Sequence, residues 1–384
     1  MPIDRASLIP ALNNIATRLR IDSIRSTSES GTGHPTSCCS MAELIAALFF
    51  AEMRFDPKDP RHTESDRFVL SKGHAAPILY AAWAEAGLFD RAELLKLRTI
   101  GSDLEGHPTP RLSFVDVATG SLGQGICAAI GTALNARRIG SDYRTYVLLG
   151  DGETAEGSVW EAADVAAMDS LDNLCGITDV NALGQSRPTM WQHDMEQFAR
   201  RWRAFGWHPI VVDGHDLSAI LDALAEARRT KGQPTMILAR TVKGKGVSFA
   251  EGKDGWHGRA FKKGEEMDRA IAELEKQEGE SGHGQGAGEG RDCAKNPRIL
   301  STRHLDRESL QVDEQPLASV IGRIKDAKTR GPDRFDRIVA VHRLVRKEAW
   351  RQGIQLVEAK HRRCRQDQRE NDEESAKPRR WWRR

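Results

Sequence analysis

The sequence predicts an α/β protein whose doubly wound sheet is mostly parallel. Short apolar runs rich in β-branched and aliphatic residues, such as 145–150 and 174–180, read as buried strands. The segment between them, 153–168, has helical spacing. Strands that alternate with helices favour parallel pairing, because a crossover helix returns the chain to the same end of the sheet.

The remaining elements follow the same alternation along the chain. The predicted strands are 68–70, 145–150, 174–180, 209–212 and 236–240. The predicted helices are 6–28, 40–53, 75–86, 123–138, 153–168, 194–204 and 217–230. We expect Ser40 to be the N-cap of the second helix. The glycine-rich loop 31–35 is expected to present His34.

Polar side chains follow two neighbouring predicted strands. Gly150-Asp151-Gly152 closes one strand, and Asn181 closes the next. Ligands of open α/β sheets bind at the carboxyl ends of the strands. A hard cation such as Mg²⁺ takes one or two protein oxygens and completes its shell with phosphate and water. Asp151 and Asn181 could supply side-chain oxygens, a backbone carbonyl just beyond Asn181 a third, and the glycines would let a diphosphate approach closely.

The spacing of these residues resembles the thiamin diphosphate signature, in which Gly-Asp-Gly is followed by 28 residues (153–180) and an Asn. Companion motifs occur in order and make residues 5–276 similar to the amino-terminal half of a transketolase. These motifs are Gly33-His34-Pro35-Thr36-Ser37-Cys38-Cys39-Ser40, Ser71-Lys72-Gly73-His74-Ala75, Glu105-Gly106-His107-Pro108-Thr109, Gly120-Ser121-Leu122-Gly123-Gln124-Gly125 and Gly255-Trp256-His257-Gly258. The resemblance implies the sheet fold of the thiamin diphosphate-binding type.

The resemblance also assigns roles to residues at matching positions. It implies that Mg²⁺, Ca²⁺ or Mn²⁺ is bound by Asp151, Asn181 and the carbonyl of Leu183. The cofactor contacts it implies are Lys72, His74, Gly120, Leu122, Gly152, Asn181 and Lys243. His34, His107 and His257 match the catalytic histidines of the substrate channel, and imidazole suits proton movement near neutral pH. Glu156 and Glu161 match acids that meet the partner subunit.

The activity implied is transfer of a two-carbon ketol unit from a ketose phosphate to an aldose phosphate, with xylulose 5-phosphate and ribose 5-phosphate as substrates. Thiamin diphosphate would carry the chemistry, and the protein would orient it. Family members are homodimers of the pentose phosphate pathway in which a second, pyrimidine-binding domain supplies a glutamate to the cofactor. That domain is not recognisable in this sequence, so we expect the isolated chain to be inactive without it.

The composition sets limits on location and partners. Residues 1–280 carry a net charge of −7 and residues 281–384 a net charge of +9, so the total of +2 combines an acidic body with a basic tail. The six cysteines show no paired metal spacing, which favours free thiols in a reducing cytoplasm. No apolar run approaches 18 residues, and the amino terminus does not have the pattern of a signal peptide. We therefore expect a cytoplasmic protein without a membrane span.

The chain divides into three predicted segments: the diphosphate-binding domain 1–276, a glycine-rich flexible segment 277–292 and a basic tail 293–384. The tail is expected to be poorly structured, because its hydrophobic periodicity is weak and arginine dominates. Its composition also suits a shifted reading frame.

Three alternatives remain open on the sequence. The chain could be the amino-terminal subunit of a split transketolase, completed by a separate pyrimidine-domain subunit. It could be a deoxyxylulose phosphate synthase-like enzyme, which shares the metal loop but is less favoured by the motifs around His74 and His107. It could also be a non-catalytic protein that binds nucleic acid or an acidic partner through its basic tail, an unfavoured interpretation because the tail lacks ordered aromatic residues or motifs.

Overall fold

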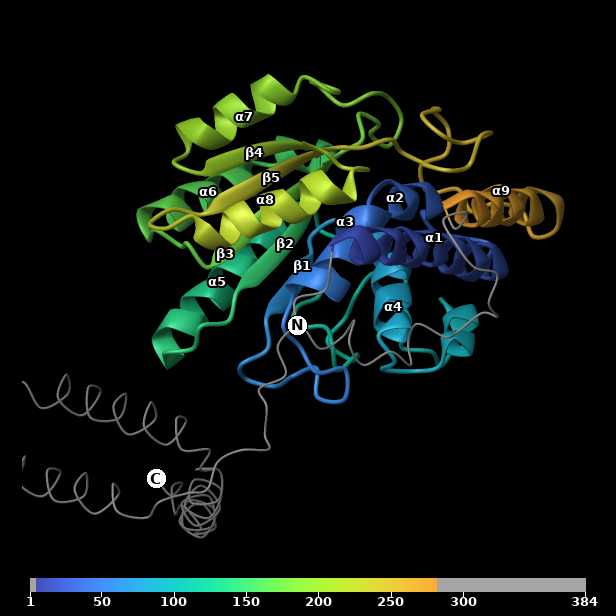
Figure 1. Ribbon diagram of the computed structural model, residues 1–384, viewed down its shortest axis with the longest axis horizontal. Coiled ribbons are helices and arrows are strands. Elements are labelled where there is room, and N and C mark those ends of the chain that lie inside the picture. Colours follow the sequence, from blue (N-terminus) through green and yellow to red (C-terminus); the bar gives the residue numbers. More distant parts are fainter. Residues whose placement is uncertain (1–4, 282–384) are drawn as a thin grey trace, which may run out of the picture. The chain divides into compact units, whose positions relative to one another are not determined.

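A computed structural model describes residues 5–281 of the chain. Its core is a sheet of five parallel strands in the order β1-β2-β3-β5-β4 (Figure 1). The strands are β1 (Arg67–Leu70), β2 (Thr145–Gly150), β3 (Leu174–Val180), β4 (His208–Asp213) and β5 (Thr235–Arg240). The predicted α/β class and the five predicted strands are confirmed, with shifts of one residue at some ends.

Both faces of the sheet are covered, as the doubly wound prediction requires (Figure 1). Successive side chains of a strand point to opposite faces. On β2, Tyr146 and Leu148 join one hydrophobic core, whereas Val147 and Leu149 join the other. The strand is therefore apolar on both sides, which is why it appears in the sequence as a continuous apolar run.

The helices that form the two layers contribute to different cores. The α-helices are α1 (Arg5–Ser30), α2 (Pro35–Ser40), α3 (Ala42–Ala47), α4 (Ala76–Glu85), α5 (Gln124–Ile139), α6 (Gly157–Met168), α7 (Met195–Ala204), α8 (Leu217–Arg229) and α9 (Glu265–Ser281). Short 3₁₀ turns cover Gly73–Ala75, Arg91–Lys96 and Gly152–Ala155. Residues of α1, α3, α4 and α8 pack in the first core, and those of α5, α6 and α7 in the second.

The predicted helix 40–53 is wrong in its start and its continuity. Helix α2 begins at Pro35, where proline is favoured because its missing N–H is not needed. Ser40 ends this helix instead of capping the next one. Its hydroxyl donates to the Ser37 carbonyl at 3.1 Å and to Asp179 at 2.6 Å, so it serves as a donor beneath the sheet edge. The chain then continues through α3 into a π-helical turn, Leu48–Glu52.

The predicted helix 153–168 also begins later than expected. A 3₁₀ turn occupies Gly152–Ala155, and α6 begins only at Gly157. The cause is the side chain of Glu153, which turns inward and accepts from the backbone N–H groups of Gly123 and Gly150. This conformation presents the diphosphate-signature glycines at the sheet edge.

Helix α9 is an element that the sequence interpretation missed. It packs with α1 around Ile21, Ile24, Ala270 and Leu274 in a third hydrophobic core. It continues through Ser281 and so overlaps the start of the predicted flexible segment 277–292. The rest of that segment and the predicted tail 293–384 lie outside the described residues.

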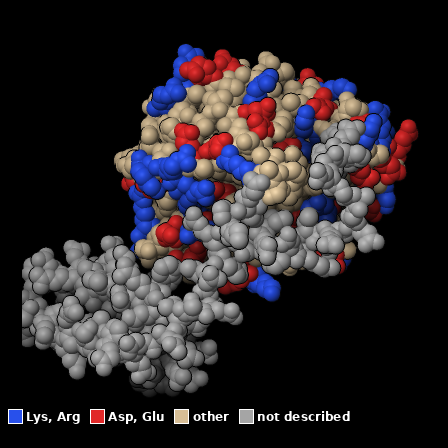
Figure 2. Space-filling model, viewed as in Figure 1, with Lys and Arg blue, Asp and Glu red and all other residues tan. Residues whose placement is uncertain are grey.

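Basic and acidic side chains are interspersed on the face in view (Figure 2). Over the part of the chain that the structure describes, no helix combines the length and the apolar character that crossing a membrane requires.

Candidate active site

The predicted cation ligands lie together where β2 and β3 end. Asp151 follows β2 and Asn181 follows β3, and both side chains are buried. The Asp151 carboxylate accepts from the Ala182 N–H at 2.8 Å and from the Thr189 hydroxyl at 2.9 Å, which ties the two loops together. Burial raises the pKa of Asp151 to about 6, with a further contribution from the charge of Asp179.

The third predicted ligand, the carbonyl of Leu183, already faces a cationic group. The Lys243 ammonium donates to this oxygen at 2.9 Å and to the Gly184 carbonyl at 3.3 Å. Asn181 Oδ1 accepts from the Leu183 N–H at 3.2 Å, so the amide and the carbonyl belong to one turn. Carboxylate, amide and carbonyl oxygens form a donor set that suits a hard divalent cation. The arrangement of these three groups is thus compatible with the predicted cation. The ammonium of Lys243 shows that a positive charge is accommodated beside them.

Lys72 lies beneath this site, in a buried ion pair. Its ammonium binds Asp179 on β3 and lies 3.4 Å from the Ser37 carbonyl. Both side chains are buried, and the Lys72 charge with its hydrogen bond outweighs desolvation to lower the pKa of Asp179. This geometry gives Lys72 a carboxylate partner within the chain, so its contact with a diphosphate remains a prediction that the pairing does not favour.

A second buried acid, Glu153, joins three loops at the sheet edge. Its carboxylate accepts from the Ser71 hydroxyl at 2.5 Å, from the Gly123 N–H at 2.8 Å and from the Gly150 N–H at 3.0 Å. Burial raises the pKa of Glu153. Because two of these donors are backbone groups, the acid fixes the path of the main chain around the predicted cofactor position.

The predicted cofactor glycines differ in what they are needed for. At Gly120, with φ of +135°, an added Cβ would lie 2.6 Å from the His107 ring, so glycine is required by packing within the chain. At Gly152 an added Cβ would meet only the Thr189 methyl, at 3.5 Å. Gly152 is exposed, so packing within the described part of the chain does not require glycine there. Leu122, a further predicted contact, is also exposed.

The predicted histidines come from four separate loops and converge. The rings of His34 and His74 are 4.8 Å apart, those of His34 and His257 4.9 Å, and those of His74 and His257 5.4 Å. His107 lies against Gly120. The Lys243 ammonium is 2.8 Å from His257 Nδ1 as well as next to the Leu183 carbonyl, so it joins the histidines to the cation ligands.

Burial keeps these imidazoles neutral. It lowers the pKa of His34 to about 4 and that of His257 to about 3, with nearby positive charges adding to both effects. It lowers the pKa of His74 well below the ordinary value, and that of His107 as well. Lys243 is affected similarly, since burial lowers its pKa to about 8. Among the described residues, the ring nitrogens of His34, His74 and His107 have no hydrogen-bond partner.

The two predicted intersubunit acids lie at the molecular surface. Glu156 and Glu161 are exposed at the start of α6 and one turn along it. The same region exposes apolar side chains, with Leu122 37%, Val165 40% and Met168 78% accessible. Exposed apolar residues beside polar ones are typical of a surface that another chain covers.

Several residues that shape the site were missed by the sequence interpretation. Asp179 and Glu153 are the two buried acids described above. His215 is another: its Nδ1 donates to Glu43 at 3.1 Å and its Nε2 accepts from the Val242 N–H at 2.9 Å, which holds the loop that carries Lys243. A signal was present for Asp179, because a charged residue inside an apolar strand requires a buried partner. No such signal marked His215.

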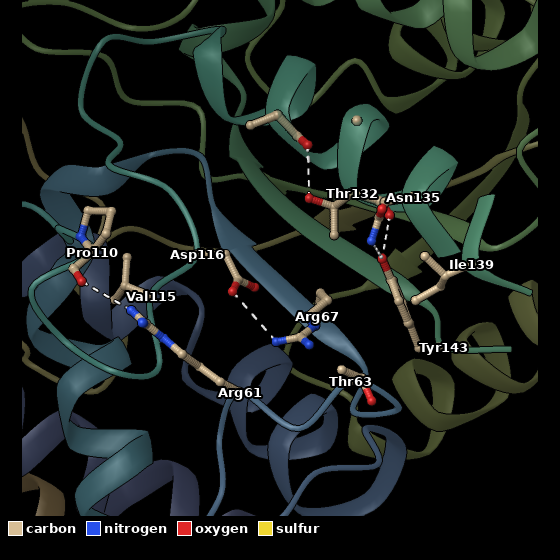
Figure 3. Close-up of a pocket in the computed structure, with 12 residues that line it drawn as sticks. Arg61, Thr63, Arg67, Pro110, Val115, Asp116, Thr132, Asn135, Ile139 and Tyr143 are labelled. Atoms are coloured by element: carbon tan, nitrogen blue, oxygen red, sulfur yellow. Dashed lines mark hydrogen bonds and ion pairs between the residues drawn. The ribbon is translucent and has the colours of Figure 1, made fainter. Parts of the chain in front are cut away.

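A groove of about 700 Å³ lies at the other end of β1 and β2, away from these residues (Figure 3). Its arginines are engaged within the chain. Arg61 donates to the carbonyls of Ser113 and Pro110, and Arg67 pairs with Asp116 at 3.5 Å. Because these donors already have partners, the groove has none of the features of the site at the carboxyl edge.

The predicted cation site is not of the kind built from clustered ionisable side chains. Within residues 5–281, no group of three or more His, Cys, Asp or Glu side chains is arranged to hold a metal. One carboxylate with an amide and a carbonyl is a different donor set, typical of a cation that also binds phosphate oxygens.

Comparisons with known proteins agree with this arrangement. The family model of the transketolase thiamine diphosphate-binding domain matches residues 11–279. Transketolase from Homo sapiens is 55% identical over 256 residues, which make up 66% of this chain and 41% of that protein. The chain thus spans less than half the length of that relative. The 6-deoxy-6-sulfo-D-fructose transketolase subunit SqwG from Clostridium sp. (strain MSTE9) is 42% identical over 266 residues, 69% of this chain and 95% of the subunit.

Solved structures show the same relationship. Transketolase from Leishmania mexicana matches with a TM-score of 0.66 and 31% identity, over 75% of this chain and 44% of that one. Transketolase from Campylobacter jejuni matches with a TM-score of 0.64 and 29% identity, over 71% and 43%. The predicted resemblance is confirmed: the chain belongs to the transketolase family and carries that family's thiamine diphosphate-binding domain.

Proposed function

We propose that this chain is the diphosphate-binding part of an enzyme that transfers a two-carbon ketol unit between sugar phosphates, with thiamin diphosphate and a divalent cation. The observation that carries the proposal is the convergence of neutral imidazoles, most of them without a hydrogen-bond partner among the described residues, beside a set of hard oxygen ligands. The proposed substrates are xylulose 5-phosphate as donor and ribose 5-phosphate as acceptor, as in the pentose phosphate pathway.

In this proposal Asp151, Asn181 and the Leu183 carbonyl hold Mg²⁺, or Ca²⁺ or Mn²⁺ in its place. Bound thiamin diphosphate supplies the nucleophilic carbon and the electron sink for breaking and forming the bond beside a ketose carbonyl. Gly152 leaves the space that a diphosphate would fill, and Lys243 lies close enough to the cation ligands to offset the remaining charge of that group. His74, which is neutral, would contribute a hydrogen bond instead of a charge.

The histidines would move protons at the substrate. A neutral imidazole can accept a proton from a hydroxyl group at one nitrogen and donate at the other. His34, His107 and His257 remain neutral at pH 7 because their pKa values are lowered. The ring nitrogens of His34 and His107 have no hydrogen-bond partner within residues 5–281, so they are available to a hydroxyl or carbonyl oxygen of a sugar.

A second protein surface would complete the site. Glu156 and Glu161 would meet the partner, next to the exposed Leu122, Val165 and Met168. The partner is either a second copy of the chain or a separate pyrimidine-domain subunit. The second possibility is supported by the relative named as a subunit, because the matched region covers 95% of its length. We place the protein in the cytoplasm, which the free thiols of Cys38, Cys39, Cys127 and Cys175 support.

Thiamin diphosphate binding tests the proposal most directly. We expect the chain to bind the cofactor in the presence of Mg²⁺, measured by isothermal titration calorimetry, and Asp151→Asn to abolish that binding. Asp213→Asn is the matched control, because Asp213 also ends a strand of the sheet, the edge strand β4, and is exposed. Binding that is absent, or unaffected by Asp151→Asn, would contradict the proposal.

Turnover tests the need for a partner. A coupled assay with xylulose 5-phosphate, ribose 5-phosphate, Mg²⁺ and thiamin diphosphate should show little or no activity for the chain alone. Ordinary turnover would show that no separate pyrimidine-domain subunit is required.

A further inference from the structure

Asp179 is the residue on which the buried contacts of the cation site converge. It lies on β3 with 0% exposure. Its Oδ2 accepts from the Ser40 hydroxyl at 2.6 Å, from the Lys72 ammonium and from Asn181 Nδ2 at 3.0 Å. Its Oδ1 accepts from the Thr241 hydroxyl. Four donors from four parts of the chain therefore fix this carboxylate in one orientation.

The contact with Asn181 determines which end of that amide faces the cation. An asparagine side chain presents an acceptor oxygen and a donor nitrogen of nearly equal shape. Here the nitrogen is held by Asp179, and the oxygen lies beside the Leu183 N–H. The reversed amide would place its oxygen 3.0 Å from a carboxylate oxygen and its NH₂ against an N–H donor, so both contacts would be repulsive.

We propose that Asp179 is a positioning residue of the cation site, which keeps the Asn181 oxygen directed at the cation without being a ligand itself. This inference rests on the proposed function, because it concerns the same cation. Residues that orient a ligand from the second layer typically change metal affinity by about 10- to 100-fold when they are replaced.

Lys72 has a separate task in this arrangement. A lone carboxylate without exposure to solvent would be strongly unfavourable, and the ammonium beside it neutralises the charge. Lys72 therefore compensates the negative charge of Asp179. The orientation of Asn181 needs only a hydrogen-bond acceptor at the position of Asp179 Oδ2. The two tasks can be separated by substitution.

Two double variants differ only in that acceptor. Asp179→Asn with Lys72→Met removes both charges and retains an oxygen at the position of Oδ2, which can accept from Ser40 and Asn181 while the new NH₂ donates to Thr241. Asp179→Leu with Lys72→Met removes the charges and the acceptor together. Replacing a buried ion pair by apolar side chains is often tolerated. Asp179→Ala with Lys72→Met serves instead of the leucine variant if the latter does not fold.

The measurement is Mn²⁺ affinity of the full chain, followed by electron paramagnetic resonance of the free ion, with circular dichroism to establish folding. We expect the asparagine variant to bind within about threefold of the wild type and the leucine variant to bind about tenfold or more weakly. Equal affinity of the two folded variants, whether high or low, would overturn the inference, because the acceptor would then be irrelevant.

Failure of the proposed cation site itself would look different. In that case the wild-type chain would bind Mn²⁺ no better than Asp151→Asn does, both alone and with thiamin diphosphate present. This result would remove the proposed metal and the inference together. A wild-type chain that binds Mn²⁺ through Asp151, with equal affinity in the two double variants, would remove the inference alone.

Discussion

The buried acids of the site and its histidines are held in opposite ways. Glu153 and Asp179 are enclosed by donors of the chain itself, four at Asp179 and three at Glu153. The imidazoles of His34, His74 and His107 are held by ring contacts and loop packing and have no hydrogen-bond partner among the described residues.

This difference separates the residues that build the site from those that are available to a ligand. A buried acid with all its hydrogen bonds made has no capacity left for substrate, but its loss disrupts the loops that it joins. An imidazole that is neutral and unbonded costs little to fold around and keeps both nitrogens available. Substitutions at the acids should therefore affect stability and, at Asp179, the orientation of the cation ligand Asn181. Substitutions at the histidines should affect binding or proton chemistry directly.

The largest expected effect on stability is at Glu153. Glu153→Leu leaves the Gly123 and Gly150 N–H groups and the Ser71 hydroxyl buried without an acceptor, which should lower the free energy of unfolding by about 4 kcal/mol. Urea denaturation measures this change. Glu153→Gln, which keeps one oxygen, should cost less than half as much. If Glu153→Leu is no worse than the exposed control Glu156→Leu, the acid does not hold the loops.

A smaller change in the free energy of unfolding is expected from substitutions at two glycines of the site, Gly120 and Gly152. Gly120→Ala forces a Cβ to within 2.6 Å of the His107 ring at a φ of +135°, and we expect it to lower the free energy of unfolding by about 2 kcal/mol. Gly152→Ala should change it by less than about 0.5 kcal/mol, because an added Cβ there makes only ordinary contacts.

For the affinity of thiamin diphosphate, the substitution at Gly152 is the one expected to matter. If a diphosphate lies against Gly152, the alanine there should weaken thiamin diphosphate binding although the fold is unaffected, as calorimetry would show. An unchanged affinity of Gly152→Ala would mean that the cofactor does not approach this backbone.

The sequence could predict the features of the molecule that depend on local patterns, but not those that depend on contacts between distant segments. The strands of the sheet and the position of Asp151 and Asn181 at its edge were predicted because apolar runs and the polar residues that end them are local features. The grouping of His34, His107 and His257 in one channel, and the assignment of His74 to the cofactor, could not be derived from spacing and came from the family resemblance. The structure brings the rings of His34, His74 and His257 within 5.4 Å of one another.

The errors have physical causes that are not local. The Ser40 hydroxyl reaches Asp179 from 139 residues away in the sequence, and this contact, together with Pro35, sets where α2 begins and ends. For Lys72 the diphosphate contact stays a prediction, but its motif gave no sign that the structure pairs it with Asp179. In both cases the deciding group lies on a different strand, and periodicity within one segment carries no information about it.

A smaller effect is expected from pH, and it falls on the histidines. His34 and His257 have pKa values of about 4 and about 3, below the ordinary value of about 6.5. Between pH 6.5 and 4 the unfolded chain binds more protons at these residues than the folded chain, so their contribution makes stability fall as the pH decreases through this window. The contribution is fully present above pH 6.5.

The double variant His34→Asn with His257→Asn measures that contribution. At pH 5.5 it should take up about two fewer protons on unfolding than the wild type, which calorimetry in buffers of different ionisation enthalpy reports. Asp151 titrates near pH 6 with the opposite sign, but it is present in both proteins and cancels in the difference. Equal uptake in the double variant and the wild type would show that burial does not keep these imidazoles neutral.

The smallest effect on the folded chain is expected at Glu156 and Glu161. Both side chains are exposed and make no hydrogen bond or ion pair among the described residues, so Glu156→Gln with Glu161→Gln should change the free energy of unfolding by less than about 0.5 kcal/mol. If these acids meet a partner, the same variant should weaken association in sedimentation experiments. Met168→Ser, which removes the most exposed apolar side chain of α6, should weaken it too. Unchanged association in both variants would place the partner on another face of the chain. Glu156 and Glu161 would then neither build the site, as the buried acids do, nor bind a ligand or partner at it.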